Sequence, residues 1–239
     1  MEQNADAEPH VFGWFDRGPI ERGDYEKVSA FLRLNHPYVG GFNLISTGGD
    51  IEEAMKIGRT LRRYLLSTVS SVRYHYENGE RFEDEQPFLS DGVRDICRGE
   101  TCICASACAL IWIGGVNRLG MIGLHRQRTE EAGFRLLSPA DASVLYHKVL
   151  DRMITYMEEM EAPQSIVDET IAAPSGDIRW VDVNEETSLY ESPNIAEWIA
   201  ASCGLEDPVQ DARNPSRMIK QVICGYNLKL TSRARLDPP

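Results

Sequence analysis

Short apolar segments alternate with longer amphipathic ones along the first two thirds of the chain. The short apolar runs predict strands over residues 10–15, 41–46, 68–74 and 118–124. Apolar positions at helical spacing predict helices over residues 23–34, 51–66 and 106–113. Strands that alternate with helices are typical of an α/β domain with a largely parallel sheet and flanking helices, and this is the fold class that we expect.

Two helices have clear start signals. Asp50 is a predicted N-cap for the helix over residues 51–66, and Glu52 and Glu53 suit its first turn. Ser138 and Pro139 begin a further helix, because proline is favoured at the first helical position. An apolar stripe at helical spacing then follows, made of Leu145, Val149, Met153, Met157 and Met160. We expect this stripe to form core or a subunit contact rather than to line a ligand site.

The segment over residues 75–101 interrupts the alternation. It is polar and charged and contains Gly79, Pro87, Gly92 and Gly99, which predicts an inserted loop rather than core. Loops of this length are uncommon without a purpose, so the segment is either a lid or substrate rim, or a mobile excursion. We therefore expect one α/β domain over residues 1–191, with the loop inside it, and a C-terminal appendage over residues 192–239.

The chain contains six cysteines, an even number, at positions Cys97, Cys102, Cys104, Cys108, Cys203 and Cys224. An even set fits disulfides formed in an oxidising compartment, although spacing does not give their pairing. Cys203 and Cys224 are candidates to staple the C-terminal appendage. A metal site is the alternative for the first four, but their spacing is not a usual zinc or iron–sulfur pattern. We predict no metal and no cofactor.

The formal net charge of −12 argues against a nucleic-acid partner, because no basic stripe offsets the acidic residues. The longest apolar run, over residues 102–116, is shorter than the roughly 20 residues of a membrane-spanning helix. It predicts a buried helix and no membrane span. The polar and acidic residues 1–8 do not resemble a secretory signal.

Two segments and a histidine carry the candidate chemistry. Ser46-Thr47-Gly48-Gly49-Asp50 supplies a glycine turn, Cys104-Ala105-Ser106-Ala107-Cys108 supplies a serine, and Gly123-Leu124-His125-Arg126 supplies an imidazole. Acyl transfer needs these three parts, namely N–H donors for an oxyanion, a hydroxyl nucleophile and a base. Taken alone, Ser106 is typical of a helix N-cap, and His125 is equally compatible with a structural role.

These motifs, together with Gly18-Pro19-Ile20 and Gly23-Asp24, resemble the ClpP/crotonase superfamily. Within it the chain is similar to the bacterial ClpP-like, periplasmic protein-like branch of serine peptidases, over roughly residues 11–190. The resemblance implies a ββα spiral fold and a homo-oligomer. With the six cysteines it favours an extracytoplasmic, periplasmic location, although the residues given contain no signal peptide.

The resemblance also implies a site. Ser106 would be the nucleophile and His125 its general base, and the N–H groups of Gly49 and Ala107 would form the oxyanion hole. The acid of ClpP-like chains lies about fifty residues after the histidine and before a short aromatic-containing strand, a context that Asp177 matches. Asp168 and Asp182 are the competitors.

The chain departs from well-known ClpP proteases around the serine, where Cys-Ala-Ser-Ala-Cys replaces a Ser-Met-Gly type of sequence, and at Thr47, where proline is common. No feature identifies docking sites for an unfoldase partner. Three functions stay open: a hydrolase acting on peptide or other acyl bonds, a catalytically weak binding or assembly module, and a crotonase-like enzyme of acyl-CoA thioesters.

Overall fold

The computed structural model describes residues 11–14, 18–35, 39–70, 74–77, 80–83, 103–125, 137–174 and 176–182, together with residues 197–198, 201–203, 224 and 227–228. Four strands form a parallel sheet in the order β1-β2-β3-β6, namely β1 (Val11–Trp14), β2 (Val39–Leu44), β3 (Ser67–Ser70) and β6 (Arg118–Leu119). The predicted α/β class and parallel sheet are confirmed.

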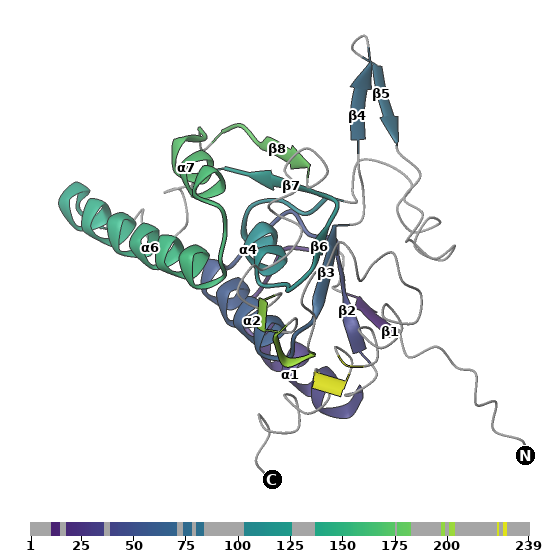
Figure 1. Cartoon of the computed structure of the whole chain (residues 1–239). Helices are drawn as coiled ribbons and strands as arrows, with labels where there is room; N and C mark the ends of the chain where they lie inside the picture. The colour runs from purple at the N-terminus through teal and green to yellow at the C-terminus, as the bar shows by residue number, and fades with distance from the viewer. Residues whose placement is uncertain are drawn as a thin grey trace, which may run out of the picture.

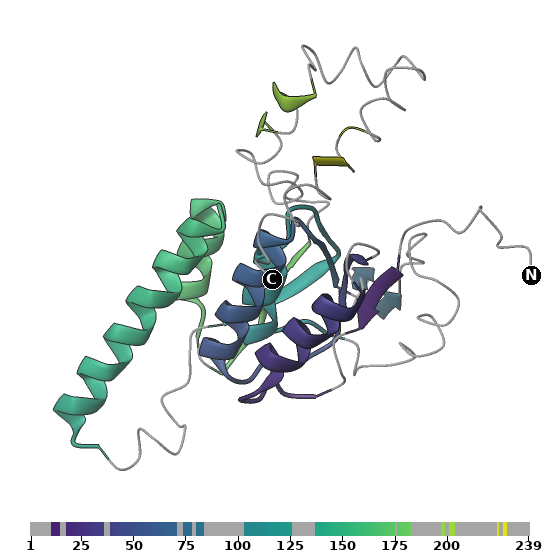
Figure 2. The same cartoon turned by 90° about the horizontal axis from the view of Figure 1, so that it is seen from below.

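Two helices connect the first three strands, because parallel neighbours need a crossover rather than a tight turn. They are α1 (Asp24–Asn35) and α2 (Ile51–Arg63). Figures 1 and 2 show α1 and α2 side by side against the sheet. The predicted N-cap of α2 is confirmed, since the side chain of Asp50 accepts a hydrogen bond from the N–H of Glu53 at 3.0 Å.

The strand expected over residues 118–124 is divided at Gly120. Gly120 has a φ of 88°, and a Cβ there would overlap the carbonyl oxygen of Ser70, so the chain turns out of the main sheet at this point. The following strand, β7 (Met121–Leu124), pairs antiparallel with β8 (Arg179–Asp182) instead. The prediction of one continuous strand was therefore wrong.

The segment expected to be an inserted loop begins with an antiparallel hairpin. Its strands are β4 (Tyr74–Glu77) and β5 (Glu80–Glu83), and Figure 1 shows them standing away from the sheet. Residues 74–77 and 80–83 contain three aromatic residues, and aromatic residues favour strands. The loop prediction was wrong for these residues, and the rest of the segment, residues 84–101, lies outside the described part of the chain.

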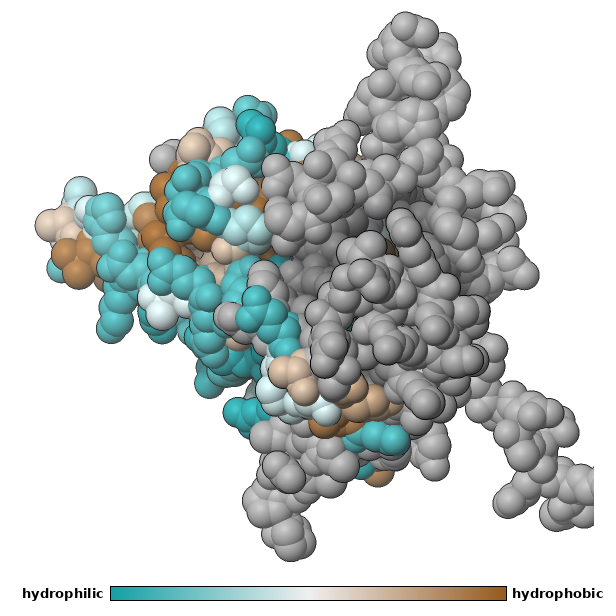
Figure 3. All heavy atoms as spheres, viewed as in Figure 1, coloured by the Kyte–Doolittle hydropathy of each residue, from teal (hydrophilic) through white to brown (hydrophobic). Residues whose placement is uncertain are grey.

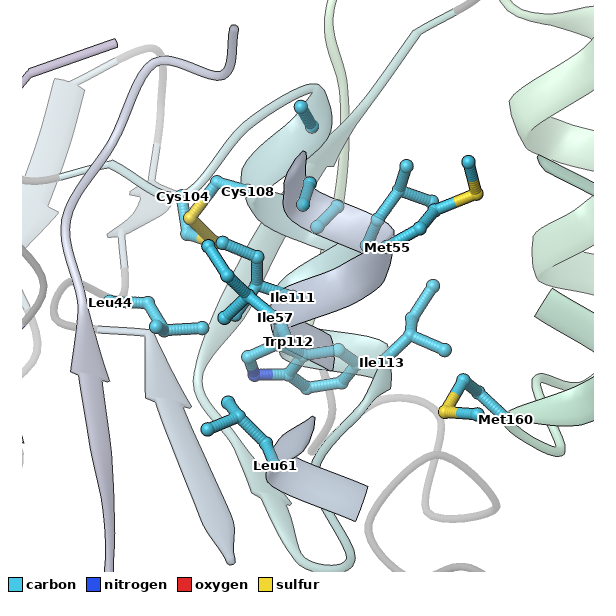
Figure 4. Close-up of a cluster of buried hydrophobic side chains, with 14 of the residues drawn as sticks. Leu44, Met55, Ile57, Leu61, Cys104, Cys108, Ile111, Trp112, Ile113 and Met160 are labelled. Atoms are coloured by element: carbon cyan, nitrogen blue, oxygen red, sulfur yellow. A yellow bond between two sulfur atoms is a disulfide. The ribbon is translucent and has the colours of Figure 1, made fainter. Parts of the chain in front are cut away.

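The short helix α4 (Ala107–Ile113) is buried along its whole length. It packs against α2 and β3, and its residues form the middle of the apolar cluster drawn in Figure 4. The indole N–H of Trp112 donates to the carbonyl oxygen of Leu119 at 2.9 Å, which satisfies the one polar atom of this buried ring. The buried helix predicted from the longest apolar run is confirmed.

The long helix α6 (Pro139–Glu159) begins where it was predicted, because the hydroxyl of Ser138 accepts a hydrogen bond from the N–H of Asp141 at 3.2 Å. Figure 1 shows α6 extending beyond the body of the protein. The predicted stripe faces the core only toward the end of the helix: Leu145 is half-buried, whereas Val149, Met153, Met157 and Met160 are buried. A further helix, α7 (Gln164–Ala172), follows.

Helices α2, α4 and α6 meet closely at a glycine. The hydroxyl of Tyr156 on α6 donates to the carbonyl oxygen of Leu110 on α4 at 2.7 Å. A Cβ at Gly58 on α2 would overlap that hydroxyl, and a Cβ at Gly114 would overlap the backbone of Gly58. The three helices can approach this closely because two contact positions lack side chains.

Two arginines cap the C-terminal ends of α4 and α6. Arg62 donates through Nη2 to the carbonyl oxygen of Met160 at 2.8 Å and through Nε to that of Gly114 at 3.1 Å. Arg118 donates through Nη2 to the same carbonyl oxygen of Met160 at 2.7 Å. Burial, with the nearby charge of Arg62, lowers the pKa of Arg118 to about 9. Cations suit these positions because helix C-terminal carbonyls carry partial negative charge.

We expect Gly58→Ala to lower the free energy of unfolding by about 1–3 kcal/mol, because its methyl group must displace Tyr156 from a packed junction. Helix propensity alone would act in the opposite direction, by about 1 kcal/mol. Urea titration followed by circular dichroism measures the change. Gly176→Ala is the control, since a Cβ there meets nothing within 4 Å, and an equal effect of the two substitutions would contradict the proposed overlap.

Candidate active site

The segment that carries the candidate nucleophile lies between the end of β2 and the end of β7. On one side, the N–H of Ser46 donates to the carbonyl oxygen of Ile103 at 2.7 Å, and the N–H of Ala105 donates back to Ser46 at 3.0 Å. On the other side, the N–H of Ser106 donates to the carbonyl oxygen of Gly123 at 2.9 Å. The serine is therefore held on both sides by backbone hydrogen bonds of a parallel type.

Ser106 occupies the N-cap position of α4 but does not behave as a cap. Its φ of 59° and ψ of −126° lie in a region that residues with a Cβ rarely adopt, and its side chain makes no capping hydrogen bond. A conformation of this kind costs about 1–3 kcal/mol. A sharp strand-to-helix turn of this kind is also found where a serine presents its oxygen for reaction.

The predicted glycine turn lies against this serine. A Cβ at Gly48 would stand 2.8 Å from the Oγ of Ser106, and a Cβ at Gly49 would overlap the backbone of Ile20. Both residues have positive φ, 106° and 139°. The two glycines are therefore required by close approach as well as by backbone conformation.

Residues 20–25 brace this turn. The N–H of Ile20 donates to the carbonyl oxygen of Gly48 at 2.7 Å, and the N–H of Asp50 donates to the carbonyl oxygen of Ile20 at 2.8 Å. The buried carboxylate of Glu53 accepts from the N–H groups of Gly23 at 3.0 Å and Tyr25 at 3.2 Å. Burial opposes ionisation of Glu53, but these hydrogen bonds and one from Lys56 outweigh it and lower its pKa. The ionised carboxylate thus ties the brace to α2.

The two predicted oxyanion-hole donors have no acceptor within the described residues. The N–H of Gly49 lies between two backbone groups that are bonded to Ile20, and Ala107 is the first residue of α4. Neighbouring N–H groups, such as those of Cys108 and Ala109, are bonded to carbonyl oxygens. Gly49 follows the glycine whose Cβ would meet Ser106, and Ala107 directly follows Ser106 in the chain, so both N–H groups belong to residues next to this contact.

Ser106 and His125 line one pocket. His125 directly follows β7 and is half-buried, and the pocket that it lines with Ser106 opens to solvent. The remaining lining is nearly all apolar and comes from α2, α4, β7, α6 and α7: Ile51, Ala107, Ala109, Leu110, Ile113, Leu124, Met153, Met157 and Thr170. The structure thus brings together the serine and the histidine that the sequence singled out nineteen residues apart.

Sequence reasoning missed most of the pocket wall. Met153 and Met157 were expected to be core or a subunit contact, and they are buried, but they also line the pocket. Thr170 on α7 was not singled out; its hydroxyl donates to the carbonyl oxygen of Ile166 at 2.7 Å. The spacing of Met153 and Met157 predicts that they lie on the same face of a helix. What that face contacts depends on how α6 packs beside α4, which the sequence does not show.

The three candidate acids lie at different places. Asp177 is exposed and precedes β8. Leu124, the residue before His125, pairs with Arg179 at the start of β8, so Asp177 lies at the end of β8 that is next to His125. Asp182 pairs with Met121 at the opposite end. Asp168 is exposed on α7, where it accepts a hydrogen bond from Gln164 at 2.9 Å. None of the three lines the pocket.

Two disulfides join four of the six cysteines. Cys203 and Cys224 are bonded as predicted, and Cys104 is bonded to Cys108, a pairing that spacing could not give. Cys97 and Cys102 lie outside the described residues. Within those residues, no group of three or more His, Cys, Asp or Glu side chains is arranged to hold a metal ion, and no helix has the length and apolar character needed to cross a membrane.

No protein-family model and no curated protein matches the chain. Among solved structures, it is similar to ClpP1 from Listeria monocytogenes, with 16% identity, a TM-score of 0.43 and coverage of 76% of this chain and 87% of that one. For a point mutant of the same ClpP1 the identity is 15% and the TM-score is 0.44, with coverage of 76% of this chain and 85% of that one. For a point mutant of the 1510-N membrane-bound stomatin-specific protease the identity is 15% and the TM-score is 0.40, with coverage of 82% of this chain and 83% of that one.

Two of these structures carry the name of the family that the sequence resembles. With identities of 15–16% and TM-scores of 0.40–0.44, the similarities carry no conclusion about activity. The fold class rests on the parallel pairing of β1, β2, β3 and β6, and any activity depends on the geometry of the site.

We expect Ser106→Gly to give a free energy of unfolding about 1 kcal/mol higher than Ser106→Ala. Both substitutions remove the hydroxyl, but only glycine adopts the observed φ of 59° without strain. Chemical denaturation of the two variants, side by side, measures the difference. An alanine variant as stable as the glycine variant would show that the positive φ is not strained.

Proposed function

We propose that the protein is a ClpP-like serine hydrolase that cleaves peptide or related acyl bonds. The observation that carries the proposal is the state of Ser106, whose hydroxyl does not cap its helix and shares a pocket with His125. A serine that only began a helix would be expected to bond to the following N–H groups, as Asp50 and Ser138 do. A strained backbone conformation that brings no stabilising contact is typical of functional sites.

In this mechanism the Oγ of Ser106 attacks the carbonyl carbon of the scissile bond while His125 accepts the hydroxyl proton. The carbonyl oxygen becomes negative and receives hydrogen bonds from the N–H groups of Gly49 and Ala107. His125 then gives its proton to the leaving amine, and an acyl-serine remains. A water molecule, deprotonated by His125, attacks the acyl-serine and releases the acid and the free hydroxyl.

Asp177 is the proposed orienting acid. The antiparallel pairing of β7 with β8 supports this choice over Asp182, which lies beside Met121 at the far end of the same pair of strands. Asp168 already accepts a hydrogen bond from Gln164 on an exposed face of α7. An ion pair between Arg179 and Glu169, at 2.7 Å, joins β8 to α7 next to this segment.

The pocket supports an apolar acyl side chain as the substrate feature next to the scissile bond. Its walls include Leu110, Ile113, Met153 and Met157, and the hydroxyl of Thr170 donates within its own helix. Burial of a charged side chain among such residues would be unfavourable. Figure 3 shows apolar surface gathered where α6 and α7 lie next to each other. Nothing within the described residues favours acyl-CoA binding or a purely structural role.

The proposed enzyme is a homo-oligomer, as the sequence resemblance implies. Val144 on α6 is 69% exposed and Leu137, just before this helix, is 38% exposed; in the proposed oligomer a contact through α6 would cover these two side chains.

We expect a fluorophosphonate probe to label Ser106 stoichiometrically in the oxidised protein, as measured by intact mass and peptide mapping. Ser106→Ala should abolish labelling, and His125→Ala should slow it by roughly 1000-fold, because the serine then lacks its base. Asp177→Asn should slow it by at least about 100-fold. Asp168→Asn is the control and should label normally. Labelling at another residue, or at Ser106 without help from His125, would refute the mechanism.

We expect acyl substrates with leucine or methionine before the scissile bond to exceed those with alanine in kcat/KM by about 10–200-fold. Met153→Ala should reduce this preference, because Met153 forms the pocket wall. Met160→Ala is a matched control, since Met160 is also buried but does not line the pocket. A preference that survives Met153→Ala unchanged would place the acyl side chain elsewhere.

A further inference from the structure

The disulfide between Cys104 and Cys108 brackets the candidate nucleophile. The two cysteines stand two residues before and two residues after Ser106, with their Cα atoms 5.2 Å apart. Both are fully buried. Figure 4 shows the bond between their sulfurs among the apolar side chains of the core, near Ile57 and Ile111.

The disulfide joins the two backbone segments that meet at Ser106. Cys104 belongs to the extended segment before the serine, where its carbonyl oxygen accepts from the N–H of Gly123 at 2.8 Å. Cys108 lies in the first turn of α4, where its N–H donates to the carbonyl oxygen of Ala105 at 3.1 Å. The covalent bond therefore fixes the direction in which α4 leaves the extended segment.

Such a constraint matters because the side chain of Ser106 makes no capping bond that would hold the turn. A relaxation of its φ from 59° toward the ordinary negative range would rotate the Oγ and the N–H of Ala107 together. Both groups have roles in the proposed reaction. A bond that stops the helix from re-orienting would keep both in place.

The short span of the bond also points to a local role. Cys104 and Cys108 are four positions apart, whereas Cys203 and Cys224 are 21 positions apart. A disulfide limits the freedom of the unfolded chain less when it closes a shorter loop. The Cys104–Cys108 bond is therefore the weaker of the two as a general stabiliser, and its position beside Ser106 is what distinguishes it.

We propose that the Cys104–Cys108 disulfide is a covalent clamp that keeps Ser106 in its reactive conformation, so that both cysteines are positioning residues for the reaction. The inference rests on the proposed serine hydrolase function. A dithiol reductant would open the clamp: two electrons and two protons pass to the sulfurs, the S–S bond breaks, two S–H bonds form, and the dithiol closes to its own disulfide. The two thiols no longer hold α4 against the extended segment.

The test compares Cys104→Ala/Cys108→Ala with the control Cys203→Ala/Cys224→Ala, which removes the other disulfide. The rate of Ser106 labelling by the fluorophosphonate is measured per folded molecule, across pH, with circular dichroism as the measure of folding. We expect the first variant to label on the order of 100-fold more slowly, a loss typical of a misplaced reacting group. Adding His125→Ala should slow the labelling of this variant little further, because Ser106 is then no longer held beside its base. The control variant should be labelled at the same rate as the wild type.

Reduction provides a second route if the first variant does not fold. The Cys203→Ala/Cys224→Ala variant is treated with dithiothreitol until peptide mapping finds Cys104 and Cys108 as thiols, and it is then reoxidised. Labelling should fall by a similar factor and return on reoxidation. A folded protein that labels at the wild-type rate with these two cysteines free, by either route, would overturn the clamp.

Amide hydrogen exchange separates this proposal from the proposed function. If the oxidised wild type is not labelled at all, the hydrolase proposal fails by itself. Faster exchange confined to residues 103–110 after opening of the disulfide would still support the clamp, and unchanged exchange there would overturn it.

Discussion

Ser106 has a positive φ, and its side chain makes no capping hydrogen bond that would stabilise this backbone conformation. Neighbouring residues hold the conformation instead. Hydrogen bonds to Ser46 and Gly123 hold the backbone on both sides. Gly48 leaves room for the serine side chain, since a Cβ there would collide with it. The rest of the site, namely the glycine turn, the first N–H of α4 and the histidine after β7, takes its position from this turn.

The two ends of α4 are used differently. The N-terminal end carries the candidate chemistry and lacks a side-chain cap, whereas the C-terminal end is secured by Arg62 and Arg118. Between them the helix is buried and bonded to Tyr156 of α6. A rigidly packed helix of this kind can tolerate strain at one end, because the surrounding contacts determine its position.

Local signals in the sequence were enough to predict the parallel sheet and the helix starts at Asp50 and Ser138. The sequence motifs also singled out Ser106 and His125, which line one pocket in the structure. The pairing of β4 with β5 and the break at Gly120 were missed. The break falls at Gly120, which has a positive φ and lies close to the backbone of Ser70, and a glycine within an apolar run does not reveal this by itself. The pairing of Cys104 with Cys108 and the pocket walls at Met153 and Met157 also depend on which elements pack together. The role of Asp177 stays a prediction, supported by strand register.

The most direct measurement is a crystal structure of the protein after reaction with a peptide boronate that carries a leucine side chain. We expect a tetrahedral boron bonded to the Oγ of Ser106, with one boron-bound oxygen accepting hydrogen bonds from the N–H groups of Gly49 and Ala107. The leucine side chain should lie between α4 and α6. His125 should lie within hydrogen-bonding distance of another boron-bound oxygen. A boronate bonded to a different residue, or one whose oxygens face away from Gly49 and Ala107, would contradict the proposed mechanism.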